Sequence, residues 1–247
     1  KVKHIRGWAK IQSTTSISVQ DQLISTKNIV IATGSKPSTF QDIVSDGRVI
    51  VNSTGALNLE KIPNKMVIIG AGVIGLEMGS VFSRIGTEVT VIEYLDHIAV
   101  GMDKEVSKSF LKILKKQGLN FILNSAVTEV KANKNMATVS YQIKGNPDLK
   151  TLSTDVVLIA TGRKAYTSGL GLENIQLHTN KNGQIVVNER LQTEHSNIYA
   201  IGDVTTGAML AHKAEDEGIA VAEQIVGQVN HINYGLIPAV VYTSPEV

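Results

Sequence analysis

Residues 66–77, MVIIGAGVIGLE, join an apolar run to three glycines in the spacing G-x-G-x-x-G. A short, wholly apolar run is typical of a strand in a parallel sheet covered on both faces. The apolar residues that follow recur at helical spacing and predict a helix over 73–86. Gly70 permits a tight turn, Gly72 lets a pyrophosphate approach bare backbone, and Gly75 lets helix pack on strand. The stretch predicts a dinucleotide-binding turn, with the phosphates at the helix N-terminus.

Glu93 follows at the end of the next predicted strand, about 20 residues beyond the glycines, which is the spacing expected of a ribose-binding acid. A carboxylate there would accept hydrogen bonds from the adenosine ribose and repel a 2′-phosphate, so NAD is favoured over NADP. Residues 94–97 contain no arginine that would reverse this preference. The alternative is that Glu93 is an ordinary solvated strand end.

Strand and helix patterns continue on both sides of this turn and predict an α/β fold with a Rossmann-like domain. Asn52, Ser53 and Thr54 are plausible helix caps, and Asn133–Asn135 reads as a hairpin turn. The expected strands lie within 3–12, 16–20, 28–35, 66–70, 88–93, 126–132, 136–143, 155–163 and 197–204, and the helices within 73–86, 103–118 and 209–227.

Two near copies bracket the glycine turn: NIVIATGS at 28–35 and VVLIATGR at 156–163. One interpretation is that two buried strands share a composition by chance. The other is that the copies mark two crossings between one domain and another inserted within it, each ending in small residues where backbone approaches a cofactor.

The composition narrows the function classes. The chain has 247 residues, and its net charge of +2, with scattered lysines, gives no reason to expect nucleic acid or an acidic membrane surface. No apolar stretch is as long as a membrane span. There is no cysteine, so these residues can supply neither a disulfide nor thiol chemistry. The final run, IPAVVYTSPEV, is strand-like, and we expect the chain to be a fragment.

Three further residues have ambiguous patterns. Asp203 follows the apolar strand IYAI, at the edge where α/β sheets bind ligands, and could hold a polyol such as ribitol; it could equally cap a turn. His212 begins a helix, where a lone histidine is more often structural. Glu77, in the first turns of its helix, by itself only favours the helix dipole. No histidine spacing is typical of a metal site, and no metal is expected.

The motifs IVIATGS, GAGVIGLEMGSVF, TVIE, GMDKEVSKSFLKILKKQG, ATGR and IYAIGDVTTGAMLAHKAEDEG occur together in this order. Their combination closely resembles the dihydrolipoyl dehydrogenases, a branch of the class I pyridine nucleotide-disulfide oxidoreductases. The resemblance implies a Rossmann-like NAD-binding domain inserted in a split FAD-binding domain, of three-layer β/β/α type. The implied parts are 1–45 and 166–235 for FAD, 46–165 for NAD, and 236–247 for the start of a dimerisation domain.

The resemblance also implies site residues. Glu77 would support catalysis near the junction of nicotinamide and flavin, Asp203 would hold the flavin ribitol, and Ala9 falls where the family usually has a glycine. The NAD contacts would be Gly70, Ala71, Gly72, Val73, Ile74, Gly75, Leu76, Glu77, Glu93, Val127 and Gly162. The FAD contacts would be Ala9, Thr33, Gly34, Ser35, Asp203, Met209, Leu210, Ala211 and His212.

The implied activity is oxidation of protein-bound dihydrolipoamide to lipoamide, with FAD and NAD as cofactors, in a homodimer that serves 2-oxo acid dehydrogenase complexes. The location would be the mitochondrial matrix or the bacterial cytoplasm. The family's first glycine-rich FAD turn, its redox-active cysteine pair and its C-terminal His–Glu pair do not occur in these 247 residues. We therefore expect the chain alone to be non-catalytic and to bind NAD(H) but little FAD.

Two alternatives remain open from the sequence. One is a related reductase, of mercuric ion or a glutathione-like disulfide, or an NADH-consuming oxidase. The other is a nucleotide-binding module without catalysis.

Overall fold

A computed structural model describes residues 2–41, 43–228 and 231–247. The chain forms two compact units: unit 1 comprises 1–36 and 163–238, and unit 2 comprises 37–162 and 239–247. The chain passes from one unit to the other after Lys36 and after Gly162, each time within two residues of an ATG triplet. Pro37 and Gly162 delimit the inserted part of unit 2. The domain bounds 46–165 and 166–235 that the resemblance implied stay a prediction.

Unit 2 is built on a five-stranded parallel sheet in the order β6-β13-β7-β8-β9. The glycine turn leaves β7, the central strand, whose Val67 lies opposite Val157 of β13 and Thr90 of β8. The strands are β6 (Ile50–Val51), β7 (Lys65–Ile69), β8 (Glu88–Ile92), β9 (Asn120–Ile122) and β13 (Val156–Ile159).

Helices cover one face of this sheet. They are α1 (Ser53–Leu57), α2 (Val73–Arg84) and α3 (Lys104–Lys116). Of the three predicted caps, Asn52 is confirmed, because its side chain accepts from the Gly55 N–H, whereas Ser53 and Thr54 lie within α1. At the start of α3, the Asp103 side chain accepts from the N–H groups of Glu105 and Val106.

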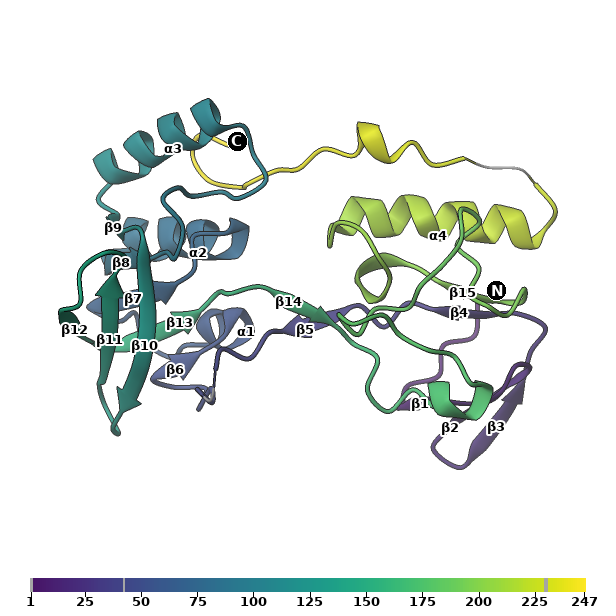
Figure 1. Ribbon diagram of the computed structural model, residues 1–247. Coiled ribbons are helices and arrows are strands. Elements are labelled where there is room, and N and C mark those ends of the chain that lie inside the picture. Colours follow the sequence, from purple (N-terminus) through teal and green to yellow (C-terminus); the bar gives the residue numbers. More distant parts are fainter. Residues whose placement is uncertain (1, 42, 229–230) are drawn as a thin grey trace. The chain divides into compact units, whose positions relative to one another are not determined.

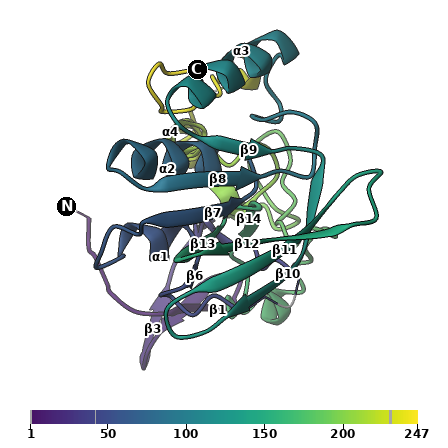
Figure 2. The same cartoon turned by 90° about the vertical axis from the view of Figure 1, so that its left-hand side faces the viewer.

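A second, antiparallel sheet covers the other face, with β10 (Ser125–Ala132), β11 (Ala137–Ile143) and β12 (Leu149–Thr154) in that order. The predicted turn at Asn133–Asn135 joins the first two strands, and the Asn133 side chain accepts from the N–H groups of Asn135 and Met136. Figures 1 and 2 show α2 and α3 on one side of the parallel sheet and β10–β12 on the other. The predicted α/β fold with three layers is confirmed in unit 2.

Residues 66–69 of β7 are wholly apolar because alternate residues of this strand pack into two different cores. Met66 and Ile68 pack with the helices, together with Leu76 and Phe110. Val67 and Ile69 pack with the antiparallel sheet. Both faces of the parallel sheet are therefore dry, and strand residues of either parity must be apolar.

Unit 1 contains an antiparallel sheet β1-β2-β3, a parallel pair β15-β4, the short pair β14-β5 and one long helix, α4. Its strands are β1 (Ala9–Ser13), β2 (Ser16–Val19), β3 (Gln22–Ser25), β4 (Ile29–Ile31), β5 (Ser35–Pro37), β14 (Arg163–Ala165) and β15 (Ile198–Ala200). The helices are α4 (Ala211–Ile225) and the 3₁₀ turns η1 (Leu172–Ile175), η2 (Gly202–Val204) and η3 (Tyr234–Leu236). Its core joins Ile29 and Ile31 of β4 to the segment 170–204.

The expected strand at the chain's last residues is wrong. Residues 239–247, all of them described, form no strand. They pack instead against the helical layer of unit 2, where Val241 is fully buried and the Gln117 side chain donates to the Ser244 carbonyl. None of the helices in the described part of the chain is long and apolar enough to cross a lipid bilayer.

Candidate functional site

The turn between β7 and α2 can be made only by glycine at two of its three positions. Gly70 has φ +104°, and a Cβ there would lie 2.6 Å from the carbonyl oxygen of Ala160. A Cβ on Gly75 would lie 2.1 Å from the carbonyl oxygen of Gly70. Both contacts are to backbone, which cannot move aside, so the two glycines bring α2 down onto the strand end.

Gly72 differs, because a Cβ added to it would meet no atom of the described residues within 4 Å. This glycine caps α2 and has no side chain to occupy the free N–H groups of the first turn. The result is an open cradle of bare backbone at the positive end of a helix, which is what a phosphate requires.

The other residues of this loop that were predicted to contact NAD differ in how far their side chains are exposed. Ala71 and Leu76 have fully buried side chains, so they can offer a ligand only their main chain. Val73 is exposed, and Ile74 is partly buried against the helical core.

Glu93 stands just beyond β8 and is held against the glycine turn. Its side chain is 8% exposed; the Ala71 N–H donates to Oε2 (2.7 Å) and the Leu95 N–H donates to Oε1 (2.9 Å). The alternative of a solvated strand end is therefore wrong. Each carboxylate oxygen keeps a second lone pair, so ribose hydroxyls can still be accepted.

A shallow hollow of about 350 Å³ lies elsewhere in unit 2 and is lined by Tyr94, the residue after Glu93, with Asn124, Ala126 and the loop 142–147. The Ser125 N–H donates to the Glu93 carbonyl (2.9 Å), which joins the start of β10 to the residue after β8.

Three residues predicted to contact NAD form hydrogen bonds with other residues of unit 2. Glu77 Oε1 accepts from the Tyr242 N–H (2.8 Å). The Val127 side chain is buried, and its carbonyl accepts from the Gln41 side chain (3.3 Å). The Gly162 carbonyl accepts from the Ser38 N–H (3.0 Å).

In unit 1 the structure brings Ser35 and Asp203 together across 168 positions of sequence. The Ser35 hydroxyl donates to Asp203 Oδ2 (2.5 Å). Arg163 fixes this serine, with Nε donating to the hydroxyl (2.7 Å) and Nη2 to the carbonyl (2.8 Å). Nearby, the Thr33 hydroxyl donates to the carbonyl of Tyr166 (2.7 Å). Arg163 ends the second ATG segment, but the sequence pattern alone predicted no role for it.

The N-terminus of α4 carries the remaining FAD candidates. Leu210 is its cap residue and has no side-chain acceptor, so the first N–H groups are open to a ligand. The ring Nε2 of His212 lies 2.8 Å from the Pro238 carbonyl oxygen, and this contact orients the ring. Ala9 is exposed at the start of β1, opposite Val19. The described residues contain no cluster of three side chains able to ligate a metal.

Sequence reasoning missed Lys213 and Glu217, which lie further along the same helix, α4. They are the only Lys and Glu among the described residues whose side chains are almost fully buried and paired with each other (2.7 Å). Their spacing of four positions was the available signal, but an exposed helix surface shows the same spacing.

Comparison with known proteins identifies the group to which these features belong. The family described as pyridine nucleotide-disulphide oxidoreductase matches residues 1–218. Mitochondrial dihydrolipoyl dehydrogenases of Caenorhabditis elegans and Homo sapiens are 48% and 47% identical over 100% of this chain. The chain spans about half the length of these relatives, 51% and 50% respectively.

A solved structure agrees with this result. The HOCl-induced flavoprotein disulfide reductase RclA from Escherichia coli superimposes with a TM-score of 0.86 and is 30% identical. The match covers 98% of this chain and 55% of that protein. The chain therefore belongs to the pyridine nucleotide-disulphide oxidoreductase family, as its motifs indicated.

Proposed function

We propose that this chain carries the NAD site and part of the FAD site of a flavin-dependent dihydrolipoyl dehydrogenase. In this proposal the inserted part of unit 2 is the NAD-binding domain and unit 1 belongs to the FAD-binding domain. Residues 236–247 would belong to the dimerisation domain.

One observation carries the proposal: the open backbone cradle at Gly72, with the Glu93 carboxylate at the end of the neighbouring strand. The pyrophosphate of NAD would lie over Gly72, where the N–H groups of α2 supply hydrogen bonds and a partial positive charge. Glu93 would accept from the ribose hydroxyls and would repel a 2′-phosphate. The residues present thus fit NAD.

The residues of unit 1 fit FAD. Asp203 would accept from the ribitol hydroxyls, and Thr33, Gly34 and Ser35 would line the same side. The N–H groups at Met209–His212 would face the flavin pyrimidine, where a helix dipole stabilises negative charge. FAD, when bound, supplies the two-electron chemistry that links a dithiol to a nicotinamide.

The overall reaction removes two electrons and two protons from dihydrolipoamide, forming its disulfide. NAD⁺ accepts a hydride, and one proton is released. A thiol–disulfide exchange step needs cysteines, which these 247 residues do not contain. Glu77 would lie near the nicotinamide and support the transfer by position.

The substrate assignment follows the relatives. Proteins named dihydrolipoyl dehydrogenase are 47–48% identical to the chain, whereas RclA is 30% identical. The proposed partners are a lipoyl domain, a 2-oxo acid dehydrogenase complex and a second copy of the protein. The nematode and human relatives are mitochondrial, which favours the mitochondrial matrix over the bacterial cytoplasm.

The test is a steady-state assay of the protein purified from its complete gene, with dihydrolipoamide as donor and NAD⁺ or NADP⁺ as acceptor. The proposal predicts reduction of NAD⁺ and little of NADP⁺. Reduction of mercuric ion or a glutathione-like disulfide by NADH in a parallel assay, with no oxidation of dihydrolipoamide, would favour a related reductase instead.

A further inference from the structure

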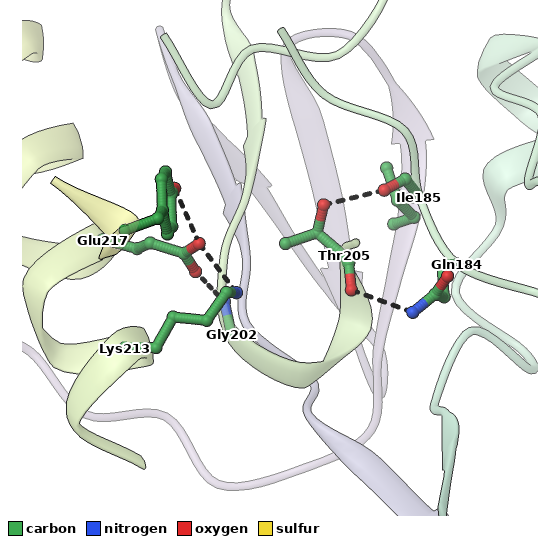
Figure 3. A network of polar contacts seen from close by, with 7 residues as sticks. Gln184, Ile185, Gly202, Thr205, Lys213 and Glu217 are labelled. Carbon is green, nitrogen blue, oxygen red and sulfur yellow. Dashed lines mark hydrogen bonds and ion pairs between the residues drawn. The ribbon is translucent and has the colours of Figure 1, made fainter. Parts of the chain in front are cut away.

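A charged pair is enclosed in unit 1 behind the candidate flavin residues. Lys213 and Glu217 lie one turn apart on α4, with side chains 2% and 1% exposed. The Lys213 Nζ lies 2.7 Å from Glu217 Oε1. Figure 3 shows the two side chains pointing toward each other. The desolvation of two charges offsets much of their attraction, so a buried pair is a poor source of stability.

The Glu217 carboxylate also accepts hydrogen bonds from two groups outside α4. The Gly202 N–H donates to Oε2 (2.6 Å), and the Tyr234 hydroxyl donates to Oε1 (3.0 Å). Burial, and then the charge of Glu217, raise the pKa of Tyr234, so its hydroxyl keeps its proton and remains a donor. Both oxygens of the buried carboxylate are thus satisfied.

The residue that Glu217 holds begins the turn that presents Asp203. Gly202 has φ +71°, and a Cβ there would lie 3.1 Å from the Ala214 Cβ, so the turn rests directly on α4. The bond from Glu217 fixes the start of η2. At its end, the Thr205 hydroxyl donates to the Ile185 carbonyl (2.8 Å) and the Gln184 side chain donates to the Thr205 carbonyl (3.3 Å). Figure 3 marks both contacts with dashed lines.

Asp203 is therefore held from two directions. Its main chain is fixed through Gly202 and Glu217, and its side chain is fixed through Ser35. Glu217 belongs to the same helix whose N-terminus carries Met209–His212. One carboxylate thereby sets the position of the Asp203 turn against that helix end.

Lys213 makes this arrangement electrically neutral. Without a partner, the Glu217 carboxylate would be an uncompensated buried charge and would reduce the positive potential that the N-terminus of α4 offers to a ligand. The ammonium group cancels that charge, and the loop at Gly207 closes over its stem, where a Cβ would lie 3.0 Å from Lys213 Cε.

We propose that Glu217, neutralised by Lys213, is a positioning residue for FAD, because it anchors the Gly202 N–H and with it the turn that carries Asp203. The inference rests on the proposed function, in which Asp203 and the N-terminus of α4 contact the flavin.

The test uses the protein purified from its complete gene and two double variants that both remove the charges. Lys213→Met with Glu217→Gln keeps an acceptor for the Gly202 N–H. Lys213→Met with Glu217→Leu removes it. Glu215→Gln, an exposed change on the same helix, is the matched control. The readouts are the FAD dissociation constant after reconstitution, the visible flavin absorption band, and the NADH dissociation constant.

The Gln double variant should bind FAD within about twofold of the unchanged protein. The Leu double variant should bind about fivefold more weakly, the equilibrium equivalent of one hydrogen bond of typical net strength, with a shifted flavin band. NADH affinity should be equal in both, since its residues lie in unit 2. Equal FAD affinity and equal spectra in the two double variants would overturn the inference.

If the Leu variant does not fold, Glu217→Asp tests the same contact with both charges kept. Its shorter side chain should weaken FAD binding and shift the band, and unchanged values would overturn the inference. An unchanged protein that binds no FAD would instead overturn the proposed function, together with the inference that rests on it.

Discussion

Replacing Glu93 by Gln separates the two tasks that the structure gives this residue. The carboxylate accepts from two backbone N–H groups, of Ala71 and Leu95. An amide has one acceptor oxygen and one donor group, so one of the two N–H groups must lose its partner. Ala71 is fully buried, whereas Leu95 is 36% exposed. The amide oxygen should therefore face Ala71, and water should reach the Leu95 N–H.

The magnitude follows from that geometry. An unsatisfied buried donor costs about 1–3 kcal/mol, and partial access of water puts this case near 1 kcal/mol. In a chain of this size that corresponds to a fall in melting temperature of about 2–4 °C. NADH binding should also weaken about fivefold, because a neutral acceptor forms hydrogen bonds about 1 kcal/mol weaker than a charged one. NADPH binding should improve relative to NADH.

Glu88→Gln is the matched control, because it makes the same chemical change on the same strand. The Glu88 side chain is 58% exposed and pairs with Lys65 at 3.3 Å. Exposed pairs contribute about 0–1 kcal/mol, so melting and NADH affinity should hardly change. Thermal melts and calorimetric titrations with NADH and NADPH provide the measurements. If Glu93→Gln and Glu88→Gln gave the same three values, the assignment of Glu93 would be refuted.

Further changes give distinct expected outcomes. Gly72→Val should leave the melting temperature nearly unchanged but reduce NADH affinity at least tenfold, because its side chain would fill only the open cradle; calorimetry checks this. Gly75→Ala should lower the melting temperature strongly, because its Cβ would lie 2.1 Å from backbone, and a melt equal to that of Gly72→Val would contradict this. Asp103→Ala should cost about 0.5–2 kcal/mol in urea unfolding through loss of the α3 cap. For Asp46, burial acts to raise the pKa, but hydrogen bonds from the N–H groups of residues 48–50 outweigh it and lower the pKa below 3.8. The stability advantage over Asp46→Ala should therefore be complete above pH 3.8 and shrink as the pH falls through the lowered pKa; an advantage independent of pH in acid would contradict this.

The sequence predicted the elements whose signals are local. The turn at Gly70–Gly75 combines backbone that only glycine can adopt with an apolar strand before it. Both features can be read directly from the amino-acid sequence. The Asn52 cap was predicted because its signal, a polar side chain just before a helix, is also local. The alternation of strands and helices then predicted the layers of unit 2.

What the sequence did not show depends on long-range contacts. The final residues have strand-like composition, but a strand needs a partner strand, and Val241 finds the helical core instead. Glu77 looked like an acid serving its own helix, yet it accepts from Tyr242, 165 positions away. Lys213 and Glu217 have the spacing of an exposed pair, and only the fold shows that they are buried.

The most direct test of the NAD site is a calorimetric titration of the protein with NADH and, separately, with NADPH. Binding of NADH with one site per chain, much weaker binding of NADPH, and loss of the NADH signal in Gly72→Val are the results that we predict. No heat with NADH, or equal affinity for the two dinucleotides, would contradict the roles given to the Gly72 cradle and to Glu93.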